Sequence, residues 1–205
     1  MDKIWIAPAP LLLASTSKAR AEMLRRAGLP AKPLAPAIEE RVLQKQLTDQ
    51  GVGPAGIARH LSAAKASGVS VSNPGAYVLG FDQTLEFEKT CLSKPLSREE
   101  LRTRLARFSG RSHLLHSGFA IARDGQVIDE GAITAVVQFR PLSDSFIETY
   151  LDLADPSVLG SVGGYQAEAL GVHLFEKIEG DFFTVVGMPL LDLLRSLRSL
   201  GLVLE

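Results

Sequence analysis

Residues 11–30 read LLLASTSKARAEMLRRAGLP, and this stretch decides the class of fold. Its first residues end an extended segment from Ile6 to Ala14, which predicts a buried strand. The hydroxyl residues 15–17 then break the strand. A helix is expected over 18–27, because apolar residues recur there on one side, and Gly28 marks its end. The pattern is a strand–loop–helix unit, which is typical of α/β folds.

Beyond this unit, strand-like and helix-like segments alternate without a strict repeat. Helices are expected over residues 57–68, 97–108, 144–153 and from 189 onward. Strands are expected over 76–80, 114–123, 127–139 and 173–178, and residues 84–87 either continue the strand 76–80 or pair with it. The length of 205 residues suits a single domain, or two tightly packed lobes, with a sizeable core. We therefore expect one α/β domain over residues 1–205, with a mixed β-sheet and flanking helices.

The composition resembles that of an average globular protein, with 46% apolar and 22% charged residues. Cys91 is the single cysteine, which excludes an intramolecular disulfide and suits the reducing cytoplasm. The net charge of −1 gives no global field that attracts nucleic acid. Apolar stretches fall short of a membrane span of roughly 20 residues, and residues 1–13 lack a signal-peptide cleavage site. We expect a cytoplasmic protein whose partners include no nucleic acid polymer and no membrane.

A candidate anion site lies where the first strand meets the first helix. Ser15, Ser17, Lys18 and Arg20 place two hydroxyls and two cations at a helix N-terminus. The free N–H groups and partial positive charge of such a terminus favour anions. We interpret the site as a cradle for a triphosphate, and the alternative is an ordinary N-cap with solvated charges. The chain has no GxxxxGK[ST] sequence, which argues against a P-loop nucleotidase.

Acidic residues form the second candidate site. Asp82 is expected in a turn at residues 80–83, directly after the buried strand 76–80. An acid at the carboxyl end of a strand lies where α/β proteins bind ligands, and it can hold Mg²⁺ or orient a water. The alternative is an Asp that stabilises the turn. Glu39 and Glu40 could complete a Mg²⁺ site, or could begin a solvated helix.

The remaining polar patterns are weaker when taken alone. Lys65 and Lys94 are isolated cations of the kind that usually solvates a surface. His113 and His116 have no carboxylate or cysteine at metal-binding spacing, so no zinc site is expected. The loop 163–171 carries glycines around one aromatic and one acidic residue. It suits a lid over a planar ligand, with an ordinary glycine-rich connection as the alternative.

Taken in order, these segments resemble the Maf family of nucleoside triphosphate pyrophosphatases. The family pattern runs LASxSPRR, DE, an EKA-type helix, GADT or GSDQ, GKP, SGRTHxxxTG, GxYxxQG or SxExLG, and ERIEGxxxxVVGLPL. The matching segments are LASTSKAR at 13–20, EE at 39–40, AKA at 64–66, GFDQ at 80–83, SKP at 93–95, SGRSH at 109–113 with SG at 117–118, YQAEALG at 165–171, and FEKIEG at 175–180 with VVGMPL at 185–190. Any single piece is weak, but eight pieces in order are specific.

The resemblance implies hydrolysis of a nucleoside triphosphate to the monophosphate and pyrophosphate, with Mg²⁺ or Mn²⁺. It implies a mixed-sheet fold like that of inosine triphosphatases, with two lobes around a cleft, often as a homodimer. By position, Asp82 matches the family's proton acceptor, and Glu40 with Glu39 matches the carboxylates near the metal. The substrate side is matched by Ser15, Ser17, Arg20, Lys65 and Lys94.

The chain departs from the family pattern at Ala19, Gln83 and Glu168, where the family selects the base. Members with Arg, Thr and Gln at these positions prefer dTTP and UTP. Members with GSDQ and a glutamate in the loop resemble a subgroup that acts on 7-methyl-GTP. Gln83 and Glu168 fit that subgroup, although Ala19 stands where it usually carries a bulky aromatic residue. A carboxylate at Glu168 could accept hydrogen bonds from a guanine-like N–H edge, or face a cationic methylated base. A modified purine nucleotide is therefore expected, with dTTP or UTP as the alternative.

Two other classes of function compete with this one. A non-catalytic, nucleotide-binding regulator of cell division would need the basic residues but not the acid Asp82. An interaction module would be supported only by the leucine-rich C-terminal helix, which a buried core explains more simply. Release of pyrophosphate from a panel of nucleotides separates these classes.

Overall fold

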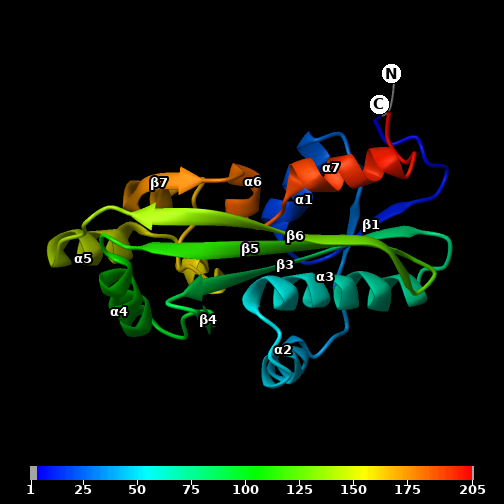
Figure 1. The fold of residues 1–205 in the computed structure, drawn as a ribbon. Coiled ribbons are helices and arrows are strands. Elements are labelled where there is room, and N and C mark those ends of the chain that lie inside the picture. Colours follow the sequence, from blue (N-terminus) through cyan, green and yellow to red (C-terminus); the bar gives the residue numbers. More distant parts are fainter. Residues whose placement is uncertain (1–3, 205) are drawn as a thin grey trace.

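A seven-stranded mixed β-sheet forms the centre of the computed structural model, which describes residues 4–204 (Figure 1). The strands lie in the order β2-β1-β3-β5-β6-β7, and β4 also pairs with β3. β1 is parallel to β2 and β3, and all other pairs are antiparallel. The expected mixed α/β fold with flanking helices is confirmed.

The strands are β1 (Leu11–Ala14), β2 (Lys32–Leu34), β3 (Tyr77–Phe87), β4 (Thr90–Leu92), β5 (Ser112–Arg123), β6 (Gln126–Phe139) and β7 (Phe175–Glu179). The α-helices are α1 (Lys18–Arg26), α2 (Glu40–Asp49), α3 (Pro54–Val71), α4 (Arg98–Phe108), α5 (Asp144–Leu153), α6 (Phe182–Val185) and α7 (Leu190–Ser199). Two short 3-10 helices are η1 (Pro156–Gly160) and η2 (Leu170–Leu174). In Figure 1, α1 and α7 cover one face of the sheet, and α3 lies on the other with α2 beyond it.

The first strand–loop–helix unit forms as expected, but its strand is shorter. Ser17 caps α1, because its hydroxyl accepts a hydrogen bond from the backbone N of Arg20 at 3.3 Å. The strand does not begin at Ile6, whose backbone N instead donates to the carbonyl of Leu202. Prolines at positions 8 and 10 separate this contact from β1, and each lacks an N–H for the sheet.

The long strand β3 overturns the expected turn at residues 80–83. The strand runs without a break through Asp82, because β5 pairs with it from Val78 to Glu86. Asp82 lies opposite Gly118 in this ladder. The polar side chains of the segment therefore belong to a strand and not to a loop.

Helix α3 packs unusually close to the sheet through two glycines. A Cβ on Gly80 would lie 2.2 Å from the carbonyl oxygen of Ser62, and a Cβ on Gly118 would lie 2.3 Å from that of Ala58. Real Cβ atoms do not approach backbone oxygens this closely, so only glycine fits either position. This close contact brings the side chains of α3 against the middle of β3.

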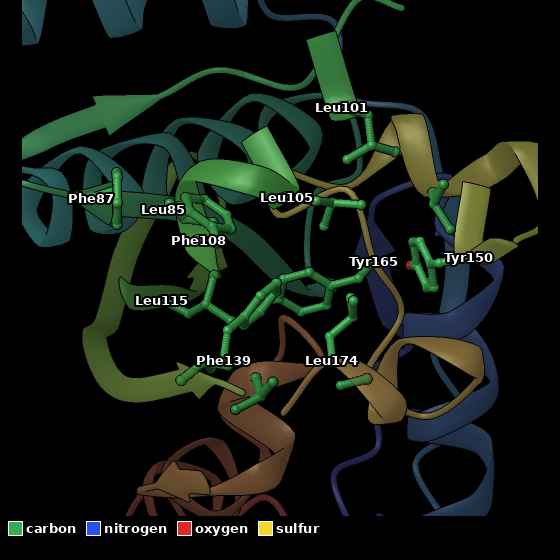
Figure 2. Packing of buried hydrophobic residues seen from close by; sticks show 14 of the residues in the cluster. Leu85, Phe87, Leu101, Leu105, Phe108, Leu115, Phe139, Tyr150, Tyr165 and Leu174 are labelled. Atoms are coloured by element: carbon green, nitrogen blue, oxygen red, sulfur yellow. The ribbon is translucent and has the colours of Figure 1, made fainter. Parts of the chain in front are cut away.

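Two large apolar clusters lie at opposite ends of the long strands. One packs α1 and α7 against β1 and β3, around residues such as Leu13, Phe81 and Leu193. The other lies at the far end, and Figure 2 shows it around Phe108 and Phe139. The strands β3 and β5 contribute to both clusters, so one continuous sheet joins the two ends.

Tyr165 belongs to the second cluster, where Figure 2 shows it beside Tyr150. Its side chain is only 5% exposed, and its hydroxyl lies 2.6 Å from His113 Nε2. The prediction of a lid over a planar ligand is therefore wrong for this aromatic ring, which the core already buries. Among residues 4–204, no helix is long and apolar enough to cross a membrane.

Candidate active site

The candidate site lies at a break in the pairing along one edge of β3. On that edge, β1 pairs with β3 as far as Leu79, and β4 pairs with it from Leu85 onward. Residues 80–84 lie between the two partners, and the loop into α1 begins where β1 ends at Ala14. Asp82 therefore does not lie at the carboxyl end of its own strand, as expected, but beside the carboxyl end of β1, and ligands of α/β proteins bind at such ends.

Asp82 lies in a cluster of three charged side chains. Its Oδ1 is 2.6 Å from Lys65 Nζ on α3, and the same Nζ is 3.0 Å from Glu40 Oε2 at the start of α2. Lys65 and Asp82 are buried, whereas Glu40 is exposed. Burial raises the pKa of Asp82, and the charge of Lys65 acts against that shift. The cluster holds a basic carboxylate beside a fixed positive charge.

The N-terminus of α1 forms the neighbouring part of the site. Ser15 is buried, and its hydroxyl accepts a hydrogen bond from the backbone N of Ser17 at 3.2 Å. Ser17 is the N-cap of α1, which agrees with the alternative interpretation of this segment as an ordinary helix cap. Lys18 and Ala19 are exposed in the first turn. The capping role does not exclude anion binding, because the remaining N–H groups of the first turn still point outward.

Arg20 links α1 to two other parts of the chain. Its Nη1 donates to the carbonyl oxygen of Phe81 and its Nε to that of Gly187, each at 3.1 Å. Burial lowers the pKa of Arg20, and the charges of Asp82 and Glu40 oppose the shift. Its guanidinium therefore belongs to the electrostatic environment of the acidic cluster.

Gln83 points to the face of the sheet opposite Asp82, because neighbouring side chains alternate along a strand. Its Nε2 lies 3.1 Å from Ser117 Oγ, 3.0 Å from the carbonyl oxygen of Thr184 and 3.1 Å from that of Val185. Gln83 is therefore bound to α6 and β5, which no pattern in the sequence indicated.

Three other expected residues are not joined to the acidic cluster. Lys94 follows β4 and Glu168 precedes η2, and both side chains are exposed. Within residues 4–204, no ion pair or hydrogen bond connects either of them, or Glu39, to Asp82 or Lys65. Their roles stay predictions that rest on the family pattern.

The carboxylates suit a divalent cation only as an open site. Asp82 and Glu40 approach the same Lys65 Nζ, and their oxygens are ligands that Mg²⁺ and Mn²⁺ prefer. Among residues 4–204, no group of three His, Cys, Asp or Glu side chains could hold a metal by itself. Mg²⁺ is commonly bound by one or two carboxylates together with substrate phosphates and water, and the pair fits that arrangement.

The two histidines of β5 differ in their surroundings. His116 Nε2 is 3.2 Å from Glu86 Oε2, and its Nδ1 is 2.8 Å from Thr134 Oγ1. Glu86 lies thirty positions away in sequence on the paired strand, beyond the reach of any spacing rule. His113 is buried in the core, and no metal cluster among the described residues includes either ring.

Comparison with known proteins gives a consistent result. Residues 10–200 match the family model described as Maf-like protein. A nucleoside triphosphate pyrophosphatase of Nitrobacter winogradskyi is 47% identical over 197 residues, which cover 96% of each chain. A 7-methyl-GTP pyrophosphatase of Mesorhizobium japonicum is 45% identical, covering 94% of this chain and 97% of its own. Another 7-methyl-GTP pyrophosphatase, from Bartonella quintana, is 43% identical over 95% and 98%.

One solved structure is a more remote match. A HAM1 protein from Coxiella burnetii aligns with 76% of this chain and 92% of its own, at 14% identity and a TM-score of 0.40. This likeness is too distant to carry an argument.

Proposed function

The chain belongs to the Maf-like protein family, and we propose that it is a nucleoside triphosphate pyrophosphatase. It would cleave the bond between the α- and β-phosphates and release a nucleoside monophosphate and pyrophosphate. The observation that supports this most directly is the buried Asp82, held 2.6 Å from Lys65 Nζ beside the N-terminus of α1. A carboxylate beside an anion-binding terminus is what hydrolysis of a phosphoanhydride needs, whereas a binding protein would gain nothing from that acid.

Asp82 is the proton acceptor in this proposal. Burial raises the pKa of its carboxyl group, which makes the carboxylate a stronger base for a proton from the attacking water. Lys65 holds the carboxylate through its 2.6 Å contact and keeps the charged form populated. Positive charge from Lys65, Arg20, Lys94 and the α1 terminus would offset the negative charge that develops on the leaving pyrophosphate.

A divalent cation, Mg²⁺ or Mn²⁺, would supply further charge neutralisation when bound. Asp82 and Glu40 are the residues that would hold it, with Glu39 adjacent to Glu40 in the chain. The two carboxylates leave most coordination positions to phosphate oxygens and water, as is usual for Mg²⁺ in enzymes that act on nucleotides.

We assign the choice of base to Ala19 and Glu168, and we favour a 7-methyl-GTP-like nucleotide. Glu168 is exposed, and its carboxylate can accept hydrogen bonds from a guanine edge or face a cationic base. Ala19 is exposed in the first turn of α1 and leaves room beside it. Two of the relatives described above bear the 7-methyl-GTP name, and the Nitrobacter relative bears the broader one.

We place this activity in the cytoplasm, with the nucleotide as the principal partner. The single cysteine, Cys91, suits a reducing compartment, and the net charge of −1 gives no attraction for nucleic acid polymers. The family resemblance favours a homodimer, which sedimentation of the purified chain would test. A cleft between the two ends of the sheet is part of the same proposal.

The proposal is tested by assaying pyrophosphate release from a nucleotide panel with Mg²⁺ or Mn²⁺. The panel contains 7-methyl-GTP, GTP, dTTP and UTP. We expect pyrophosphate and monophosphate in equal amounts, with 7-methyl-GTP cleaved fastest. Release of orthophosphate alone, or no turnover on any nucleotide, would reject the proposed activity. A preference for dTTP or UTP would reject only the proposed base.

Substitution Glu168→Gln tests the choice of base. It removes the charge and keeps the shape, so we expect the ratio of kcat/KM between 7-methyl-GTP and GTP to fall while turnover persists. Glu176→Gln, at an exposed residue of β7, is the matched control and should leave that ratio unchanged. An unaltered base profile in Glu168→Gln would remove this residue from base selection.

A further inference from the structure

The short helix α6 is the centre of an anchored turn on the face of the sheet opposite Asp82. We call residues 181–187 the α6 turn. Asp181 caps α6 by accepting hydrogen bonds from the backbone N atoms of Phe183 and Thr184. Glycines with positive φ lie at both ends, Gly180 at 113° and Gly187 at 94°. Such glycines permit sharp changes in chain direction, so the position of the turn must be fixed by contacts to the sheet.

Two sheet residues supply those contacts. Gln83 on β3 donates from Nε2 to the carbonyl oxygens of Thr184 and Val185 at 3.0 and 3.1 Å. Ser117 on β5 donates from Oγ to the carbonyl of Thr184 at 2.7 Å, and its Oγ is 3.1 Å from Gln83 Nε2. Ser117 and Thr184 are fully buried. Buried polar contacts of this kind are costly to break, because the partners left behind lose their hydrogen bonds.

The α6 turn also holds the side chain of Arg20. The carbonyl oxygen of Gly187 accepts a hydrogen bond from Arg20 Nε at 3.1 Å, and the carbonyl of Phe81 accepts one from Nη1. A Cβ on Gly187 would lie 3.5 Å from both Arg20 Nη2 and Gln83 Oε1, so Arg20 and Gln83 meet at this glycine. Two fixed carbonyls define the plane of a guanidinium, whose planar N–H fork has little freedom left.

We propose that Gln83 and Ser117 are positioning residues that act on the reaction through Arg20. The two residues fix Thr184 and Val185, and this sets the position of the Gly187 carbonyl. That carbonyl then orients the Arg20 guanidinium towards the phosphate site beside Asp82. This rests on the proposed pyrophosphatase function. It also adds a structural role for Gln83: its Nε2 is engaged by protein acceptors, so Oε1 is the amide atom that can still face a nucleotide.

Hydrogen exchange of the free protein tests the anchor without any assay of activity. In Ser117→Ala and in Gln83→Ala, the amide hydrogens of Val185, Val186 and Gly187 should exchange about three- to tenfold faster, the range expected from one lost hydrogen bond. Ser70→Ala is the matched control, because Ser70 is equally buried and its hydroxyl bonds to Ser67 and Gly125, away from the α6 turn. Unchanged exchange in both test variants would overturn the proposal.

Steady-state kinetics test the route through Arg20. Ser117→Ala should lower kcat/KM about three- to tenfold, by the same factor on every nucleotide of the panel, and Ser117→Thr should restore it. Gln83→Ala should cause at least the same loss. Combining the two should cost no more than about twofold beyond the worse single variant, because both act on Thr184. In an Arg20→Met background, Ser117→Ala should cause no further loss.

Each result that would contradict the proposal rejects a different part of it. If Gln83→Ala lowers kcat/KM while Ser117→Ala leaves it unchanged, Gln83 acts through a contact of its own and not through the α6 turn, and the proposal is wrong. If Ser117→Ala still lowers kcat/KM in the Arg20→Met background, the coupling through Arg20 is wrong. If the wild-type protein cleaves no nucleotide, the proposed function fails and takes the catalytic half of this proposal with it. The exchange measurement would still decide the anchor separately.

Discussion

A single buried lysine that contacts two carboxylates gives this molecule its candidate chemistry. Lys65 lies within ion-pair distance of Asp82 and Glu40, which come from different elements. Burying such charges is costly unless they are paired, so the cluster contributes little net stability to the fold. Buried ionisable groups with specific charged partners are typical of functional sites. Asp82 has the partner and the surroundings of a working base.

His113 and Tyr165 provide a contrasting pair whose role is structural. The Nε2 of His113 lies 2.6 Å from the hydroxyl of Tyr165, and the ring stacks on Phe108 at 4.6 Å between centroids. Burial lowers the pKa of His113 from 6.5 to about 3. The native protein therefore binds fewer protons than the unfolded chain between these values, and its stability falls as the pH drops below about 6.5.

The double variant His113→Phe/Tyr165→Phe tests this linkage. Each single variant should lower the free energy of unfolding by about 1–3 kcal/mol at pH 7.5, because one buried polar group loses its partner. The double variant should recover most of that loss. Between pH 7.5 and 5, wild type should lose about 2 kcal/mol more than the double variant, measured by urea unfolding. Equal losses would show that His113 already ionises in the fold.

The sequence predicts the residues of the candidate site better than it predicts their contacts with residues far away in the chain. The family pattern identified Asp82, Lys65 and Glu40, and the structure brings them together. The carbonyl partners of Gln83 lie in α6, about a hundred residues later in the chain. The sequence offers no local signal for such a contact, because only the folded sheet brings the two segments together.

At the scale of helices and strands, the sequence predicts an element's ends best where residues next to it in the chain set them. The predicted helix 144–153 has the observed bounds of α5, because Ser143 caps its N-terminus. The hairpin of β5 and β6 follows from Asp124 and Gly125, which both adopt positive φ. The expected turn at residues 80–83 is wrong, because Asp82 and Gln83 resemble turn residues until Lys65 and α6 supply their partners.

The packing of α3 on the sheet makes a prediction for these elements. Gly118→Ala should lower the free energy of unfolding by about 3 kcal/mol, at the upper end of overpacking, because its Cβ would lie 2.3 Å from a backbone oxygen that cannot rotate away. Gly160→Ala is the control, because nothing lies within 4 Å of its Cβ position. Thermal unfolding of both variants measures the difference. A Gly118→Ala protein as stable as the control would contradict the close contact of α3.

At the scale of the whole molecule, the residues that stabilise the fold and the residues proposed for catalysis lie in different parts of the sheet. Two apolar clusters at opposite ends of β3 and β5 hold the fold, while the charged cluster lies between the ends of β1 and β4. The fold class followed from the order of elements in the sequence. The break in the edge of β3 did not, because pairing partners along one edge are a property of the complete sheet.

Metal removal should therefore affect activity but not the fold. Chelation with EDTA should abolish pyrophosphate release, and Mg²⁺ or Mn²⁺ should restore it. The melting temperature without nucleotide should stay within about 2 °C, because no three-ligand cluster among residues 4–204 ties the structure to a metal. Full activity in EDTA would exclude a role for the divalent cation, and a collapse of the melting temperature would reveal a structural site.

The catalytic role of Asp82 is tested most directly by the turnover of Asp82→Asn, measured beside nucleotide binding and thermal unfolding of the same variant. The substitution keeps the shape of the side chain and removes the proton acceptor. We predict that kcat falls by at least about a hundredfold, the lower range for loss of a general base, while the fold and nucleotide binding persist. Undiminished release of pyrophosphate by a folded Asp82→Asn protein would contradict a role for Asp82 as the proton acceptor.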